Sequence, residues 1–149
     1  PLGSARLKCA SPKSNVYEMD VTFSALQSNV FGLNLCSGHG RKVTISYDTD
    51  SHNLVIDRTH CADVDIPKFA RMAHAQVLPQ NGKLRMHIFV DKSSVEIFCN
   101  DGQDVFTLQT FPSEDQIGIE TFAQKSVTNM ELKWWPLQDV WRHCSKDKK

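Results

Sequence analysis

Residues 84–102 read LRMHIFVDKSSVEIFCNDG, two apolar segments joined by a short polar break. Every second residue from Leu84 to Val90 is apolar. Because successive side chains of a β-strand point to opposite faces, this period of two predicts a half-buried strand. Residues 91–94 then turn the chain into a second strand over residues 95–99. The sequence Asn100-Asp101-Gly102 is a tight-turn signal that predicts a further hairpin.

The same alternation recurs on both sides of this hairpin, in short segments separated by turn residues such as Asn81-Gly82. Many short strands at this spacing, with no clear helix of any length, are typical of all-β proteins. We predict a two-sheet antiparallel β-sandwich of the jelly-roll or concanavalin-like type, with about ten or more strands. The expected strands cover residues 16–23, 31–36, 43–47, 54–58, 73–77, 84–90, 95–99, 104–111, 117–123 and 127–134.

The length of 149 residues suits one domain. Pro1-Leu2-Gly3-Ser4 resembles the remnant that a protease leaves when a purification tag is removed, so it is set aside. We therefore expect a tag remnant over residues 1–4, an N-terminal extension over 5–15, the β-sandwich over 16–142 and a polar tail over 143–149.

Charge and hydropathy exclude several classes of partner. Lys plus Arg and Asp plus Glu number 17 each, so the formal net charge is zero. Nucleic acids and anionic membranes attract a field of one sign, which this composition does not supply. No apolar run approaches the roughly 20 residues of a membrane span, and no signal peptide is evident. We expect neither a nucleic-acid nor a membrane partner.

The five cysteines contain no C-x-x-C pair, which argues against a zinc site. Cys99 lies within a strand pattern and is expected to be a buried thiol. Cys9 with Cys144 could tie the termini together, and Cys36 with Cys61 could join neighbouring strands, but the sequence leaves the pairing open.

Catalytic chemistry finds little support in the residues. The chain has no G-x-S-x-G elbow, no H-E-x-x-H pair and no phosphate-binding loop. A glycosidase needs two carboxyl groups, about 5–5.5 Å or about 6.5–9.5 Å apart. The carboxylates on or beside strands fit salt bridges and turn caps better than catalysis. We predict no catalytic residue, metal ligand or cofactor. The carboxylates considered are Asp57, Asp91, Glu96, Asp101 and Glu120.

A sugar-binding site has different requirements from a catalytic one. It needs polar groups that hydrogen-bond to vicinal hydroxyls, beside an apolar or aromatic wall. Several polar residues stand at the ends of expected strands and meet this description if they converge. Trp134, Trp135 and Trp141 could be stacking platforms. Packing in a core or domain interface, with adjacent tryptophans pointing one in and one out, is favoured for them. The candidate carbohydrate-binding residues are Tyr47, Asp48, Asp57, Arg58, Asp91, Lys92 and Ser93.

The stretch over residues 84–102 closely resembles the signature hairpin of the C-terminal domain of family 32 glycoside hydrolases, which include invertases, inulinases and levanases. Further matches follow in the right order, and together they span about residues 16–141. They are FGLNL at 31–35, ISYD at 45–48, LVIDRT at 54–59, GIE at 118–120 and WPL at 135–137 before Trp141.

The resemblance implies an accessory β-sandwich beside a five-bladed catalytic propeller of a retaining enzyme. The family's catalytic motifs, W-M-N-D-P-N-G, R-D-P and E-C, are absent here, and Glu96 precedes Ile97 rather than a cysteine. Lys92 stands where the family usually has arginine, which removes a planar bidentate fork. The parent family slightly favours an extracellular location.

Three functions follow from this resemblance. The first is a structural module that stabilises the catalytic propeller or its oligomer. The second is a fructan- or fructose-binding module, because the sandwich is also similar to a fructan-binding carbohydrate module, number 66 in that classification. There we expect Asp57, Arg58 and Asp91 to bind hydroxyls and Tyr47 to form part of the wall. The third, an enzyme complete in 149 residues, is disfavoured by the missing motifs.

Overall fold

The computed structural model describes residues 5–10, 16–38, 40–58, 72–91, 94–100, 104–109, 118–125 and 127–136. The regular structure in these residues is β-strand, which confirms the all-β prediction. In this part of the chain no helix is long and apolar enough to cross a membrane. The strands are β1 (Ala5–Ala10), β2 (Tyr17–Ser24), β3 (Val30–Gly38), β4 (Arg41–Asp48), β5 (Asn53–Asp57), β6 (Met72–Gln76), β7 (Leu84–Val90), β8 (Ser94–Cys99), β9 (Asp104–Gln109), β10 (Gly118–Ala123) and β11 (Asn129–Pro136).

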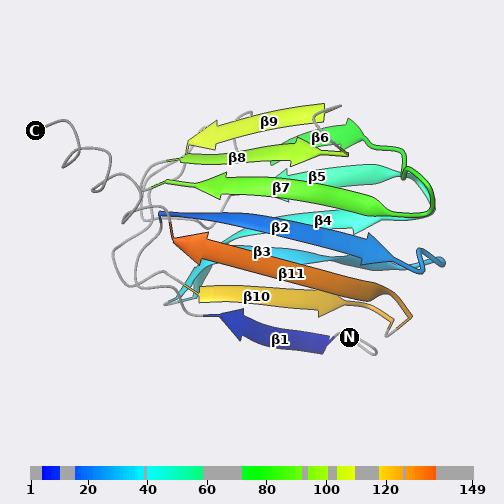
Figure 1. Cartoon of the computed structure of the whole chain (residues 1–149), viewed down its shortest axis with the longest axis horizontal. Helices are drawn as coiled ribbons and strands as arrows, with labels where there is room; N and C mark the ends of the chain where they lie inside the picture. Colours follow the sequence, from blue (N-terminus) through cyan, green and yellow to red (C-terminus); the bar gives the residue numbers. More distant parts are fainter. Residues whose placement is uncertain are drawn as a thin grey trace, which may run out of the picture.

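These strands form two stacked antiparallel sheets, so the predicted β-sandwich is confirmed (Figure 1). The sheet nearer the viewer has five strands in the order β11-β2-β7-β8-β9, and the sheet behind it has six in the order β1-β10-β3-β4-β5-β6. Because each sheet carries one apolar face, stacking the two faces buries both in a single core.

Strands β2 and β7 show how the sequence pattern builds that core. They pair in register from Tyr17 opposite Val90 to Phe23 opposite Leu84. Every second residue on each strand is buried, and the residues between are partly or fully exposed. Burying one large apolar side chain contributes about 1.5–3 kcal/mol, so the alternating pattern fixes which face of each strand turns inward.

The turn residues occupy the conformations that the sequence predicts. Asn81 and Gly82 both have positive φ, 54° and 73°, between the bridged residues Gln80 and Lys83. Two successive residues with positive φ match the right-handed twist of the strands that they connect, which is why Asn-Gly is favoured there. The predicted turn at residues 81–82 is confirmed.

Asn29 joins segments that are distant in the sequence. It is buried between β2 and β3, and its side-chain Nδ2 donates to the carbonyl oxygen of Lys125 at 2.9 Å and to Thr128 Oγ1 at 3.0 Å. Its Oδ1 accepts from the backbone amides of Lys125 and Val30, both at 2.9 Å. One side chain thereby ties the start of β3 to the connection between β10 and β11.

Residues 5–10 differ from the prediction, which placed them in an N-terminal extension. They form β1, which pairs with β10 from Ala5 opposite Ala123. Apolar residues at positions 5, 7 and 9 alternate with Arg6 and Lys8. This segment therefore carried the same period-two signal as the other strands.

Two of the cysteines lie in the core as thiols. Cys99 is buried, as predicted, at the end of β8. Cys36 is also buried and forms no disulfide, so the considered bridge to Cys61 is wrong. Cys36 has a φ of 51° in a stretch where the β3–β4 register shifts, so the bulge places its side chain in the core. The possible disulfide between Cys9 and Cys144 involves side chains that lie outside the described part of the chain.

Candidate functional site

The described members of the predicted sugar-binding set lie at two opposite ends of the sandwich. Strands β4 and β5 are antiparallel, with Asp48 opposite Asn53 and Thr44 opposite Asp57. Asp48 and Asp57 therefore sit at opposite ends of this hairpin, separated by four residues, or roughly 13 Å along the strand. Tyr47 lies with Asp48, and Arg58 follows Asp57.

Asp91 shares an end with Asp57 and Arg58. Asn100, just after β8, donates through Nδ2 to the carbonyl oxygen of Leu78, just after β6, at 2.7 Å. The ends of β6 and β8 thus meet at one end of the sandwich, so the ends of their antiparallel neighbours β5 and β7 lie at the other (Figure 1). Asp57, Arg58 and Asp91 therefore lie at the same end of the sandwich, on two different sheets. Lys92 and Ser93 lie outside the described residues.

Tyr47 turns inward. Its ring is 1% exposed and packs in the core beside Phe31, with ring centroids 5.7 Å apart. Its hydroxyl donates to the carbonyl oxygen of Val77 at 2.6 Å. Burial, with smaller contributions from the charges of Asp48 and Cys99, raises the pKa of Tyr47 to about 12. The ring therefore supports the end of β4 from inside the sandwich, and the expectation that it lines the wall of a sugar site is wrong.

Asp57 belongs to a polar row that crosses the outer face of the six-stranded sheet. It lies opposite Thr44, which lies opposite Asn34, which lies opposite Glu120. Thr44 Oγ1 donates to Asn34 Oδ1 at 2.8 Å, and Asn34 Nδ2 donates to Glu120 Oε1 at 3.4 Å. Ser37 Oγ donates to the same carboxylate oxygen at 3.3 Å. These contacts give Glu120 and the buried Asn34 structural partners.

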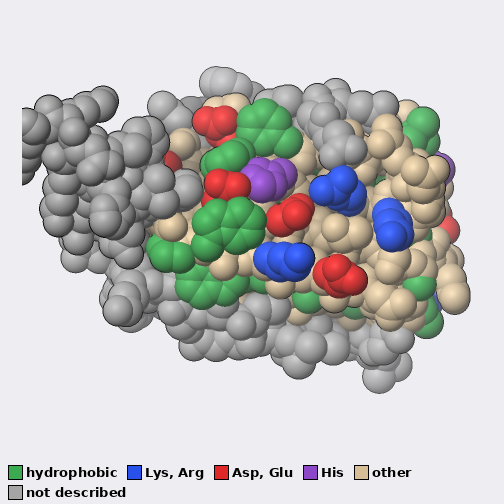
Figure 2. Space-filling model, viewed as in Figure 1, with side chains coloured by type: hydrophobic (Ala, Val, Ile, Leu, Met, Phe, Trp, Pro, Cys, Tyr) green, Lys and Arg blue, Asp and Glu red, His purple; other side chains and the backbone are tan. Residues whose placement is uncertain are grey.

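The outer face of the five-stranded sheet is chemically different, because aromatic rings and carboxylates alternate across its strands. One row runs Trp135, Glu18, Phe89 and Glu96 over β11, β2, β7 and β8. The next row runs Lys133, Asp20, His87 and Phe98 over the same strands. Figure 2 shows hydrophobic, acidic and histidine side chains gathered side by side on this face. We call these eight residues the ring–carboxylate face.

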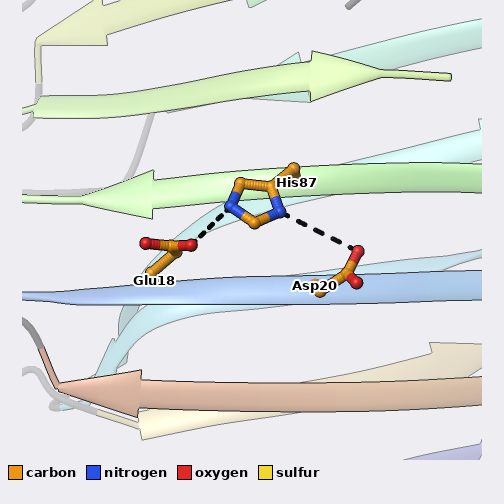
Figure 3. Close-up of polar contacts among 3 residues, drawn as sticks. All are labelled: Glu18, Asp20 and His87. Carbon is orange, nitrogen blue, oxygen red and sulfur yellow. Dashed lines mark hydrogen bonds and ion pairs between the residues drawn. The ribbon is translucent and has the colours of Figure 1, made fainter. Parts of the chain in front are cut away.

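His87 links two of these carboxylates (Figure 3). Its Nε2 lies 2.7 Å from Glu18 Oε2, and its Nδ1 lies 3.9 Å from Asp20 Oδ1. An ionised carboxylate only accepts hydrogen bonds, so Nε2 donates to Glu18. Because β2 presents both carboxylates on the same face, the imidazole on β7 is hydrogen-bonded to Glu18 and also lies beside Asp20.

The aromatic rings of the face pack close together, and His87 lies next to two of them. The ring centroids of His87 and Phe89 are 4.9 Å apart, and those of His87 and Trp135 are 6.3 Å apart in an edge-on arrangement. Phe89 and Phe98 are 5.8 Å apart, also edge-on. Trp135 is 38% exposed, so part of its indole is open to solvent.

The tryptophan prediction is confirmed for the adjacent pair. Trp134 packs against the core, with its ring 6.1 Å from that of Tyr17, whereas Trp135 faces outward. Trp141 lies outside the described residues. Sequence reasoning did not single out Glu18, Asp20 or His87. Alternation alone shows that each faces away from the core, but only the register of β2 against β7 brings them together.

Among the described residues, no three His, Cys, Asp or Glu side chains are placed to hold a metal ion. Of the three groups in Figure 3, His87 and Glu18 are joined by a hydrogen bond. A carboxylate oxygen that accepts from His87 still has lone pairs for other donors.

Comparison with known proteins assigns the chain by family. Residues 2–136 match the family described as glycosyl hydrolases family 32 C terminal. A levanase of Bacillus subtilis is 31% identical over 137 residues, which cover 89% of this chain and 20% of that protein. A sucrose-6-phosphate hydrolase of Streptococcus mutans is 33% identical over 122 residues, 81% of this chain and 25% of that protein.

Solved structures agree with this assignment. The exo-inulinase of Aspergillus awamori superposes with a TM-score of 0.74 and 27% identity, covering 91% of this chain and 27% of the exo-inulinase. The sucrose-6-phosphate hydrolase of Lactobacillus gasseri gives a TM-score of 0.72 and 26% identity, covering 89% and 28%. This chain thus spans only about a fifth to a quarter of the curated relatives.

Proposed function

This chain belongs to the family of glycosyl hydrolase family 32 C-terminal domains, and from that premise we propose that it is a non-catalytic accessory module. Its partner is the catalytic β-propeller of a retaining glycoside hydrolase that acts on sucrose or β-fructans, and its role is to stabilise that propeller or its oligomer. The observation that carries the proposal is the match over residues 2–136 to a C-terminal domain, together with the small share of each relative that the chain covers.

The arrangement of the carboxylates supports a non-catalytic role. A retaining glycosidase places two carboxyl groups about 5–5.5 Å apart on either side of the bond that it cleaves. Glu18 and Asp20 instead point from one strand toward the same imidazole, on the outside of a sheet. Glu120 lies on the other sheet, where it accepts hydrogen bonds from Asn34 and Ser37 of the neighbouring strand.

The accessory role is tested in the longer protein that contains this sequence. We expect deletion of residues 5–136 to lower the thermal unfolding midpoint of the catalytic domain by several degrees, since the deletion uncovers apolar surface. Sucrose, levan and inulin should still be cleaved at low temperature by the shortened protein, and not by the 149-residue chain alone. An unchanged midpoint contradicts the stabilising role, and fructose released by the isolated chain contradicts the non-catalytic one.

A second candidate function is β-fructan or fructose binding. The observation that favours it is the shared end of the sandwich that holds Asp57, Arg58 and Asp91. These residues are proposed to bind hydroxyl groups together with Lys92 and Ser93, whereas Asp48 and the buried Tyr47 lie at the opposite end of the β4–β5 hairpin. The Arg58→Ala, Asp91→Ala double mutant should lose affinity for levan by at least about tenfold. Unchanged affinity removes these residues from the site.

A further inference from the structure

The ring–carboxylate face presents a combination of groups that protein interfaces usually separate. The cores of protein–protein interfaces are depleted in charged residues, which collect at the rim. Here Glu18 lies directly between Trp135 and Phe89 in one cross-strand row. Adjacent strands are about 4.8 Å apart, so one small ligand can contact a ring and a carboxylate at the same time.

The Glu18 carboxylate is positioned before any ligand arrives. His87 holds Glu18 through a 2.7 Å hydrogen bond and stands 3.9 Å from Asp20. Their side chains remain 19% and 33% exposed. Each carboxylate has about four lone-pair positions, and His87 uses one on Glu18, so acceptors remain for further donors. Groups held in place in this way lose less entropy when a ligand binds.

Trp135 supplies the apolar half of the site. Its indole is partly open to solvent and packs edge-on with the His87 ring, with the two planes 64° apart. A flat, partly exposed aromatic surface next to hydrogen-bond acceptors fits a ligand that has both an apolar face and several hydroxyl donors. Carbohydrates have this combination. Carboxylates at the centre of the face favour a neutral sugar, which donates hydrogen bonds, over an anionic one.

We propose that Trp135, Glu18, Asp20 and His87 form a shallow binding site for a neutral carbohydrate of the β-fructan class. One sugar unit stacks on Trp135 and donates hydroxyl hydrogen bonds to Glu18 and Asp20. His87 is a positioning residue that holds the Glu18 carboxylate through their hydrogen bond, with Asp20 beside it. The inference rests on the second proposed function, carbohydrate binding, but places the ligand on a different surface from Asp57, Arg58 and Asp91.

The site is tested by titrating the isotope-labelled 149-residue chain with fructose, sucrose and inulin oligosaccharides and following backbone and indole NMR signals. Concentrations above about 10 mM detect complexes with dissociation constants in the millimolar range. We expect signals of β2, β7 and β11 on the ring–carboxylate face, and the Trp135 indole signal, to shift in a saturable way. Trp135→Ala and Glu18→Gln should each weaken binding by roughly tenfold. Trp135→Phe, which keeps a ring, should retain part of the affinity.

Glu131→Gln is the matched control, because it removes one negative charge from β11 on the same outer face, two cross-strand rows away from Trp135. Its affinity should equal that of the unmodified chain. For His87, the substitution His87→Ala should weaken binding, and His87→Gln, which can still donate to Glu18, should restore part of it. If His87 acted only through the stability of the fold, His87→Ala would lower the unfolding midpoint, and His87→Gln would not restore the affinity for the sugar.

The outcomes separate this inference from the function on which it rests. Saturable shifts at Asp57, Arg58 and Asp91 that persist in Trp135→Ala overturn the site and leave carbohydrate binding standing. The absence of a shift with every sugar, from a folded sample, overturns both. In that case, protection of the same face when the catalytic domain is present would identify it as a surface for protein contact.

Discussion

At the scale of single residues, Gly32 shows how closely β3 and β4 approach each other. A Cβ atom built at Gly32 would lie 1.8 Å from the carbonyl oxygen of Ile45 and 2.9 Å from the Cα of Ser46. Both neighbours belong to the backbone of β4, so they cannot move aside without separating the strands. The position therefore excludes every residue that has a side chain.

We expect Gly32→Ala to lower the free energy of unfolding by about 3 kcal/mol or more, because it forces backbone atoms apart in a packed sheet. Urea titration followed by fluorescence measures the loss. Gly40→Ala is the control: Gly40 has open space around it and a φ of +75°, so its cost should be only the strain of a left-handed residue, about 1–2 kcal/mol. Equal losses in the two variants would refute the steric argument.

Tyr17 and Tyr47 predict opposite effects of removing a buried hydroxyl. The Tyr17 hydroxyl is buried and has no hydrogen-bond partner among the described residues, whereas that of Tyr47 donates to Val77. Tyr17→Phe should be neutral or stabilising, since an unsatisfied buried polar group is lost. Tyr47→Phe should cost about 1 kcal/mol. Urea unfolding of both variants near neutral pH makes the comparison, and a larger loss for Tyr17→Phe would contradict it.

Tyr47 also predicts how stability changes in alkali. Its pKa rises from the ordinary tyrosine value of 10.0 to about 12 in the folded protein, mainly because the ring is buried. The folded state therefore holds the proton more tightly. The stability due to the neutral hydroxyl is complete below pH 10 and is lost as the pH rises toward 12. Unfolding free energies measured across this range should fall less steeply in Tyr47→Phe; equal slopes would show that Tyr47 does not control the loss.

At the scale of elements, Asn29 holds β3 to the connection between β10 and β11. Its amide makes four hydrogen bonds with Lys125, Thr128 and Val30. Asn29→Ala should lower the free energy of unfolding by about 2–4 kcal/mol, because several partly buried backbone groups lose their partners. Ser28→Ala removes one exposed hydrogen bond, to Asp50, and should change stability by less than about 0.5 kcal/mol. Similar unfolding curves for the two variants would contradict the bridging role.

The elements also show what the sequence could predict. Alternation over residues 84–90 and the turn at Asn81-Gly82 determine β7 and its start, because burial and positive φ are local requirements. The end-to-end separation of Asp48 from Asp57 follows from pairing β4 with β5. The meeting of Glu18, Asp20 and His87 depends on the register of β2 against β7, between segments more than sixty residues apart. No local pattern encodes such a register, so this part of the candidate site appears only in the fold.

At the scale of the whole molecule, the two sheets share one core, and each contributes a buried thiol to it. Cys36 lies in β3 of the six-stranded sheet and Cys99 at the end of β8 in the five-stranded sheet. A common core predicts that neither sheet keeps its structure when the other unfolds. The two cysteines thus report on the two sheets separately.

We expect both thiols to resist alkylation in the native protein and to become reactive at the same urea concentration. Peptide mapping by mass spectrometry after a short pulse of iodoacetamide measures each cysteine individually. Coincident midpoints indicate one cooperative unit. If Cys99 reacted at a clearly lower urea concentration than Cys36, the five-stranded sheet would open first and the shared-core description would be wrong.

The pairing of β1 with β10 and of β2 with β11 has a consequence for biosynthesis. Ala5 pairs with Ala123, and Tyr17 pairs with Pro136, so the first two strands of this domain find these partners only among its last strands. Loop closure over such separations slows folding, and a waiting strand exposes unpaired backbone. We therefore expect a nascent chain that stops before β10 and β11 to remain a chaperone client, and native folding to begin only once residue 136 has cleared the exit tunnel.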